Sequence, residues 1–236
     1  MSHILGSKEI FYNNIDKNKI KIAFEIGSRD IEDAIIINNI YNCKVYAFEC
    51  NPDCLEVCRK KIKEINNDNI ILIEKAVHLE DNNDITFYPF DLNKYDNMGA
   101  SSFYKIDFVT TRNKNDADYN RPNPQKEIKV PGTRLDTFMK NNNIDEIDLI
   151  FMDVQGYELN AIKSLGDKIK NVKYIFCECS IISTYENGCS FKELYDYLIE
   201  NNFRYVSSSY YNYNLPDLTI KHKCEFDSLF VNKNYQ

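Results

Sequence analysis

The 236-residue sequence has no tryptophan, only seven glycines, only six prolines and only three histidines. With so little glycine and proline, it contains no extended low-complexity linker. Its eight cysteines include no Cys-x-x-Cys pair, whereas zinc sites commonly use such close pairs. We therefore expect no bound metal, and we expect the cysteines to be small buried thiols in a reducing compartment.

Long apolar segments and an excess of positive charge are also missing. No run reaches the roughly 18 residues that a membrane-spanning helix needs, and the N-terminus has no apolar signal core. The formal net charge is -7, whereas polyanion binding usually leaves a basic footprint. These absences predict a cytoplasmic protein with no membrane or nucleic-acid partner, and they leave the oligomeric state open.

Apolar residues make up 43% of the chain, which is enough for one sizeable α/β core. We expect residues 1–19 to be an N-terminal extension and residues 20–236 to be a single domain, with a substrate-side insertion around 84–130. Outside the insertion, strand and helix patterns alternate. This alternation predicts a mostly parallel sheet with right-handed crossovers and helices on both faces.

The expected elements follow from these patterns. Strands are predicted at 20–26, 44–49, 70–77, 148–153, 172–179, 205–209 and 226–232, the last two pairing antiparallel at the sheet edge. Helices are predicted at 8–14, 31–41, 52–65, 134–141, 157–165 and 191–200. Inside the insertion we predict strands at 84–90 and 126–130 and a polar substrate-side loop at 109–125, with disorder of that loop as the alternative.

Two strand ends carry the first functional signal. The first strand ends in Glu25-Ile26-Gly27, and the second ends in Glu49, about twenty residues later. In a doubly wound sheet these ends lie side by side at the carboxyl edge, where ligands bind. A glycine there lets the backbone approach a ligand, and an acid on the second strand can hold ribose hydroxyls. The pattern predicts a nucleoside-type cofactor, the alternative being a plain strand–turn–helix crossover.

Charge distinguishes between the nucleoside cofactors. Dinucleotides need G-x-G-x-x-G so that bare N–H groups meet a pyrophosphate, and here Arg29 replaces the second glycine. Glu25 and Asp30 flank the turn and would repel a pyrophosphate by roughly 1 kcal/mol or more per close pair. S-adenosyl-L-methionine has no phosphate, its sulfonium and ammonium suit an acidic turn, and Arg29 or backbone N–H groups suit its carboxylate.

Acidic residues later in the chain are expected at the same carboxyl edge of the sheet, beside the crevice where the cofactor is expected to bind. Asp153 ends the strand at 148–153, and strand order reverses beside the first strand, so Asp153 is expected next to the reactive end of the cofactor. A carboxylate that ends a buried strand needs a partner or a ligand. Glu178, which ends the strand at 172–179, and His78 are further catalytic candidates, with a structural role as the alternative for each. Glu158 is either functional or a favourable first-turn helix residue.

The order of these segments resembles the FkbM-type methyltransferases from about Lys21 to Tyr205. The specific part is the stretch Asp148 to Glu158, which reads Asp-x-x-x-x-Asp-x-x-Gly-x-Glu and follows the helix containing Leu135-Asp136. The other matching segments are Glu-Ile-Gly, Phe-Glu-Cys-Asn-Pro, Glu-Lys-Ala-Val, Gly-Ala-Ser-Ser-Phe, Thr-Arg-Leu-Asp-Thr-Phe and Phe-Cys-Glu. The resemblance implies a Rossmann-like class I methyltransferase fold that uses S-adenosyl-L-methionine. It also implies O-methylation of a hydroxyl on a sugar, glycan or glycosylated small molecule.

The sequence departs from the family pattern in two places. Phe151 and Gln155 stand where the family commonly has Lys and Glu, and Arg29 or Asp30 stands where members often have a second glycine. These changes leave the predicted cofactor residues in place. They leave the substrate and the general base open.

We expect Glu25 and Gly27 to shape the methionine end, Glu49 to hold the ribose, and Asp81 or the backbone of residues 76–77 to lie near the adenine. The cofactor-binding candidates are Glu25, Gly27, Ser28, Arg29, Glu49, Cys50, Asn51, Ala76, Val77 and Asp153. The catalytic candidates are Asp153, Glu178 and His78. Alternatives are a non-catalytic module with the same fold, an RNA methyltransferase, which the net charge disfavours, and a nucleotide-dependent dehydrogenase, which the acidic turn disfavours.

Overall fold

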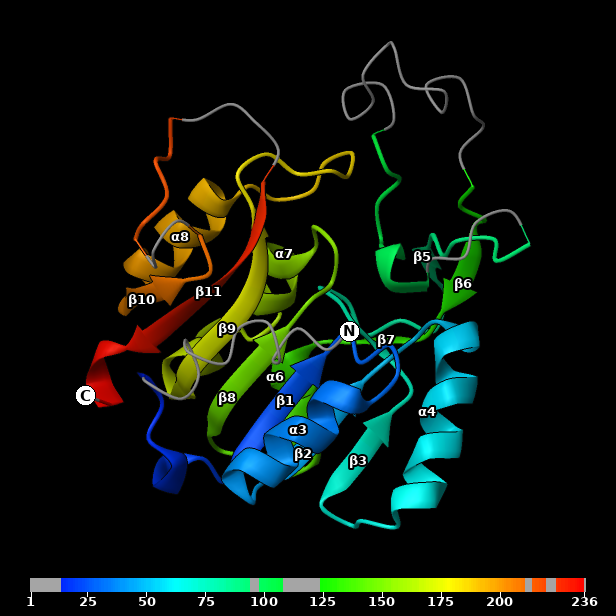
Figure 1. Ribbon diagram of the computed structural model, residues 1–236, viewed down its shortest axis with the longest axis horizontal. Helices are drawn as coiled ribbons and strands as arrows, with labels where there is room; N and C mark the ends of the chain where they lie inside the picture. Colours follow the sequence, from blue (N-terminus) through cyan, green and yellow to red (C-terminus); the bar gives the residue numbers. More distant parts are fainter. Residues whose placement is uncertain (1–13, 94–97, 108–123, 211–213, 220–223, 236) are drawn as a thin grey trace.

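The computed structural model describes residues 14–93, 98–107, 124–210, 214–219 and 224–235. A seven-stranded sheet of order β10-β11-β9-β8-β1-β2-β3 forms the centre of this described part (Figure 1). Its strands are β1 (Ile22–Ile26), β2 (Lys44–Phe48), β3 (Ile70–Ile73), β8 (Ile147–Met152), β9 (Val172–Ser180), β10 (Phe203–Ser208) and β11 (Glu225–Asn232). Neighbouring strands from β9 to β3 run parallel, which confirms the predicted mostly parallel sheet.

The last strand reverses direction. β11 lies between β9 and β10 and pairs antiparallel with both, so that β10 forms the sheet edge. The predicted antiparallel pairing of the two C-terminal strands is therefore confirmed. The structure adds that β11 is the inner strand of the pair.

Helices cover both faces of the sheet (Figure 1). α3 (Glu32–Tyr41) and α4 (Pro52–Ile65) lie on one face, and α6 (Leu135–Asn141), α7 (Glu158–Lys163) and α8 (Phe191–Glu200) lie on the other. All six residues of β8 are buried, because a central parallel strand is covered on both sides. Five of them are apolar, and the sixth, Asp148, accepts the N–H groups of Lys21 and Ile22. Each face holds its own apolar core, one including Ala34 and Ile37 of α3 and the other including Phe138 of α6.

The start of α4 follows the sequence signals. The Asn51 side chain accepts a hydrogen bond from the backbone N–H of Asp53 at 3.2 Å, and Pro52 occupies the first helical position. An N-cap side chain satisfies a backbone donor that the helix leaves open, and proline has no N–H to lose there. The predicted bounds of this helix are confirmed, and its N-terminus is fixed directly beside the end of β2.

The segment predicted as one strand at 70–77 is divided in two. β3 ends at Ile73, and β4 (Ala76–Val77) pairs instead with β7 (Gly132–Thr133) in a separate two-stranded sheet. The break has a local cause, because the N–H of Lys75 turns back to the carbonyl of Ile73 and the N–H of Ala76 bonds to Pro131. The prediction of a continuous strand was therefore wrong at its C-terminal end.

The insertion forms a small sheet of its own. β5 (Ile85–Phe87) pairs antiparallel with β6 (Ile128–Val130), and this pair packs on Cys50 near the start of α4. Both strands are shorter than predicted. Most of the predicted loop at 109–125 and all but the last residue of the predicted helix at 8–14 lie outside the described residues.

All eight cysteines are free thiols. Six of them are buried as expected, whereas Cys189 and Cys224 are partly exposed. Among the residues that the structure describes, no helix is both long and apolar enough to cross a membrane.

Candidate active site

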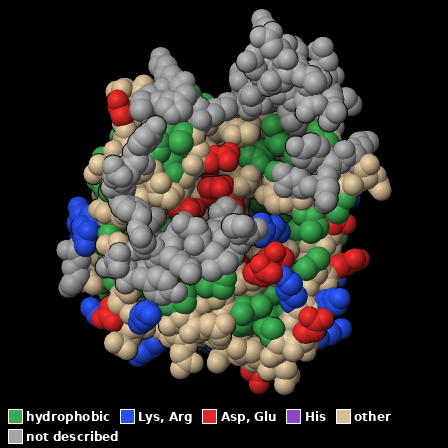
Figure 2. All heavy atoms as spheres, viewed as in Figure 1, with side chains coloured by type: hydrophobic (Ala, Val, Ile, Leu, Met, Phe, Trp, Pro, Cys, Tyr) green, Lys and Arg blue, Asp and Glu red, His purple; other side chains and the backbone are tan. Residues whose placement is uncertain are grey.

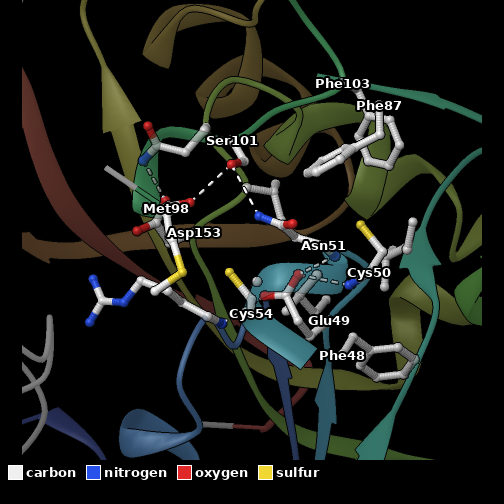
Figure 3. Close-up of a pocket in the computed structure, with 18 of the residues that line it drawn as sticks. Phe48, Glu49, Cys50, Asn51, Cys54, Phe87, Met98, Ser101, Phe103 and Asp153 are labelled. Carbon is white, nitrogen blue, oxygen red and sulfur yellow. Dashed lines mark hydrogen bonds between the residues drawn. The ribbon is translucent and has the colours of Figure 1, made fainter. Parts of the chain in front are cut away.

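A cavity opens at the carboxyl ends of β1, β2 and β8 (Figure 3). Ile26 pairs with Phe48 on one side and with Met152 on the other. The residues that follow these positions, Gly27, Glu49 and Asp153, therefore meet at one edge of the sheet, and all three line the cavity. The sequence prediction that these strand ends lie side by side is confirmed.

Glu49 lies at the floor of the cavity and is 8% exposed. Its Oε1 accepts the N–H groups of Cys50 and Asn51, and its Oε2 accepts the N–H of Arg29, each at 2.7 Å. Burial raises the pKa of this carboxyl, and the three N–H donors act in the opposite direction. A carboxylate has about four acceptor positions, so Oε2 retains capacity for one further donor such as a ribose hydroxyl.

The end of the first cavity that lies away from Asp153 is apolar. Figure 3 shows the rings of Phe87 and Phe103 together on one side and Asp153 away from them. The backbone of Ala76 and Val77 also lines the cavity. An apolar slot beside a buried carboxylate fits a nucleoside, whose base is flat and whose ribose carries hydroxyl donors.

Gly27 has a φ of +89° and touches the neighbouring strand end. A Cβ atom there would lie 1.9 Å from the carbonyl oxygen of Asp153. We expected this glycine to let the backbone approach a ligand. The structure adds a stronger reason, because without a side chain the ends of β1 and β8 can meet.

A second cavity adjoins the first. Both are lined by Gly27, Arg29, Gly99, Asp153 and Gln155. In the described part of the chain, four carboxylates and one guanidinium line the second cavity: Asp30, Asp33, Asp153, Glu225 and Arg29. Figure 2 shows acidic side chains gathered where this face of the molecule is hollowed. Asp153 thus lines both the first cavity and the acidic second cavity.

Gln155 connects two of the acidic side chains by hydrogen bonds. Its Nε2 donates to Asp153 Oδ1 at 2.7 Å and to Glu178 Oε2 at 2.6 Å. The hydroxyl of Tyr185 lies 2.5 Å from Gln155 Oε1. Burial and the neighbouring Asp153 raise the pKa of Glu178 well above its ordinary value.

Glu158 supports the turn that carries these groups. Its Oε1 accepts the N–H groups of Val154 and Gly156, and the Cys189 thiol donates to its Oε2. Burial raises the pKa of Glu158 from 4.5 to about 7, and the nearby Asp153 contributes. The side chain therefore has a structural role in the folded turn.

Glu158 makes stability depend on pH. Its folded pKa is raised, so its contribution favours folding at low pH and is lost as pH rises from about 4.5 to about 7. Between pH 6 and pH 8 this loss is about 1 kcal/mol, or about 2–4 °C in melting temperature. We expect Glu158→Gln to remove this contribution from the difference in melting temperature between pH 6 and pH 8, measured by thermal denaturation. The exposed control Glu64→Gln should leave the difference unchanged, and an equal change in both variants would contradict the assignment.

Three predicted site residues do not line the first cavity. Glu25 is buried beneath the turn, where the Ser28 hydroxyl donates to it, and it lines neither cavity. Ser28 lines only the second cavity. His78 does not line either cavity, contrary to its expected place in the crevice, and stacks on Tyr157 with ring centroids 5.3 Å apart. Burial lowers the pKa of His78.

Two further candidates line neither cavity. Asp81 accepts hydrogen bonds from Thr133, Arg134 and Thr137 at the start of α6, so it holds that helix. Glu178 is linked to Asp153 through Gln155, and its catalytic role stays a prediction. The remaining candidates, Arg29, Cys50, Asn51, Ala76 and Val77, line the first cavity.

Sequence reasoning placed the insertion near the substrate but did not identify which of its residues line the site. Met98, Ser101 and Phe103 line the first cavity, and Asn51 donates to Ser101 at 3.3 Å. In the sequence analysis the run Gly-Ala-Ser-Ser-Phe served only as part of the family resemblance. The sequence signal that could have identified these residues is the run of small residues inside an otherwise polar insertion. Among the described residues, no three His, Cys, Asp or Glu side chains are grouped so that they could hold a metal ion.

Comparisons with known proteins agree with this geometry. The model of the Methyltransferase FkbM domain matches residues 25–205. The chain is 25% identical over 179 residues to the 2-O-methyltransferase NoeI of Sinorhizobium fredii (strain NBRC 101917 / NGR234), covering 75% of this chain and 70% of that protein.

Solved structures share the fold. TrmK of M. capricolum, in complex with S-adenosyl-homocysteine, has a TM-score of 0.52 at 13% identity, covering 99% of this chain and 69% of that one. Fibrillarin of Aeropyrum pernix, with natively bound S-adenosyl-L-methionine, has a TM-score of 0.53 at 9% identity. The match covers 97% of this chain and 74% of that one. The chain therefore belongs to the FkbM methyltransferase family, and its fold is that of the class I methyltransferases.

Proposed function

We propose that the protein transfers the methyl group of S-adenosyl-L-methionine to a hydroxyl of a sugar, glycan or glycosylated small molecule. The observation that carries this proposal is the position of Asp153, which lines both the cofactor cavity and the adjoining acidic cavity. The similarity to a 2-O-methyltransferase supports oxygen as the acceptor atom.

The second cavity suits a hydroxylated acceptor. Carboxylates such as Asp30, Asp33 and Glu225 accept hydrogen bonds from hydroxyl groups. The same carboxylates would repel the phosphates of RNA. This charge supports a sugar over a nucleic acid as the acceptor.

When bound in the first cavity, S-adenosyl-L-methionine would supply a methyl carbon on a positively charged sulfur. As the acceptor oxygen bonded to this carbon, the electron pair of the broken carbon–sulfur bond would stay on sulfur. Asp153 takes the hydroxyl proton as this bond forms. Glu49 holds the ribose, and the walls of the cavity exclude water and align the two reactants.

The proposal is tested by incubating the protein with methyl-labelled S-adenosyl-L-methionine and separate panels of sugars, glycosides, nucleosides and RNA. Label in a sugar or glycoside, at an oxygen located by mass spectrometry, is the expected result. Label in RNA alone would replace the proposal with the RNA methyltransferase alternative. Cofactor binding without transfer to any panel member would favour the non-catalytic module.

Glu49→Ala is expected to weaken S-adenosyl-L-methionine binding by about 10- to 100-fold, because a charge-assisted hydrogen bond contributes about 1.5–3 kcal/mol. Isothermal titration calorimetry measures the change. Glu56→Ala, on the exposed face of α4, is the control and should bind normally. Unchanged affinity in Glu49→Ala would reject the ribose role.

A further inference from the structure

The carboxyl groups of Asp153 and Glu178 are held together by one side chain. Gln155 Nε2 donates one hydrogen to each of them, at 2.7 and 2.6 Å. Tyr185 fixes the other end of the same amide. Gln155 itself has a φ of +54°, a conformation that non-glycine residues seldom adopt, so the surrounding contacts hold it in place.

The charges around this pair decide how many protons it holds. Glu158 of α7 and Glu225 of β11 raise the pKa of Glu178, in addition to burial and Asp153. Arg29, from the turn after β1, is a cation that interacts with Asp153. Two ionised carboxylates beside two more acids are costly, whereas one shared proton leaves a single negative charge.

We propose that Asp153 and Glu178 form a carboxyl pair that holds one proton in the resting enzyme, with Gln155 as its positioning residue. This inference rests on the proposed hydroxyl acceptor for its catalytic use. During transfer, the acceptor O–H bond breaks and its proton goes to Asp153, so the pair then holds two protons. The pair loses its negative charge in the same step in which the sulfonium loses its positive charge.

Ligand binding tests the charge of the pair without any acceptor. S-adenosyl-L-methionine carries the sulfonium and S-adenosyl-homocysteine does not, so the ratio of their dissociation constants reports the negative charge beside sulfur. We expect Asp153→Asn to reduce the preference for the methyl donor by about tenfold or more. Glu178→Gln retains a hydrogen-bond donor and removes no charge, so it should change the preference by less than about threefold.

Glu225→Gln is the control for a nearby charge outside the pair, and it should change the preference less than Asp153→Asn does. Equal losses in Asp153→Asn and Glu178→Gln would show two ionised carboxylates and overturn the proposal. An unchanged preference in Asp153→Asn would also overturn it. Failure of the sugar assay would reject the proposed function without affecting these ratios.

Infrared difference spectroscopy gives a second readout. At pH 7, wild-type protein minus Glu178→Gln should show the carbonyl band of a protonated carboxyl group, and its absence would contradict the shared proton. Gln155→Leu should shift this band and lower the preference for the methyl donor. A purely structural role for Gln155 would lower thermal stability and leave both readouts unchanged.

Discussion

Replacing Asp153 by asparagine is expected to slow methyl transfer by about 10²–10⁴-fold, the usual contribution of a positioned general base. Asparagine has nearly the same shape, so the cavity is retained while the proton acceptor is lost. The turnover number should be measured at saturating S-adenosyl-L-methionine with the acceptor that the labelling panel identifies. Saturation separates this loss from the weaker donor binding expected of the same variant.

Asp145→Asn is the matched control, because Asp145 is an exposed aspartate just before β8. It should have normal turnover. Full activity in Asp153→Asn would remove this residue from the mechanism and leave alignment of the reactants as the source of catalysis.

Gly27→Ala is expected to lower the free energy of unfolding by about 3–4 kcal/mol, because it combines a strained positive φ with overpacking. The new methyl group would lie 1.9 Å from the carbonyl oxygen of Asp153, a backbone atom that cannot turn aside. Chemical denaturation measures the loss. Donor binding should fall as well, since the ends of β1 and β8 would separate.

Gly166→Ala is the control that separates the effect of a positive φ from the effect of a steric clash with the backbone. Gly166 also has a positive φ, of +48°, but its nearest neighbour is the Asp136 carboxylate at 3.1 Å. It should cost about 1 kcal/mol. Equal losses in the two variants would show that contact with Asp153 is not what requires glycine at position 27.

The sheet and the cofactor side of the site were predictable because their signals are local. Short apolar runs ending in Gly27, Glu49 and Asp153 mark parallel strands, and such strands end at one edge. Asn51 and Pro52 likewise mark the start of α4. The rules for parallel sheets then bring together residues that lie far apart in the chain.

The part of the site that the insertion supplies was less predictable, because its contacts with the rest of the site have no periodic pattern. Ser102 donates to the carbonyl of Gln155, 53 positions away, and Asn51 meets Ser101, 50 positions away. His78 is a residue that the sequence placed in the site but that the structure does not. It follows a strand, as a catalytic residue often does, but its ring stacks on Tyr157. Residue type and strand position did not determine where that side chain points.

The most direct measurement is a crystal structure of the protein with S-adenosyl-homocysteine. The ribose should lie against Glu49, the adenine between the apolar walls near Phe103, and the sulfur at the end of the cavity that Asp153 lines. A nucleoside bound outside this cavity, or one that leaves Glu49 without a ribose contact, would contradict the account.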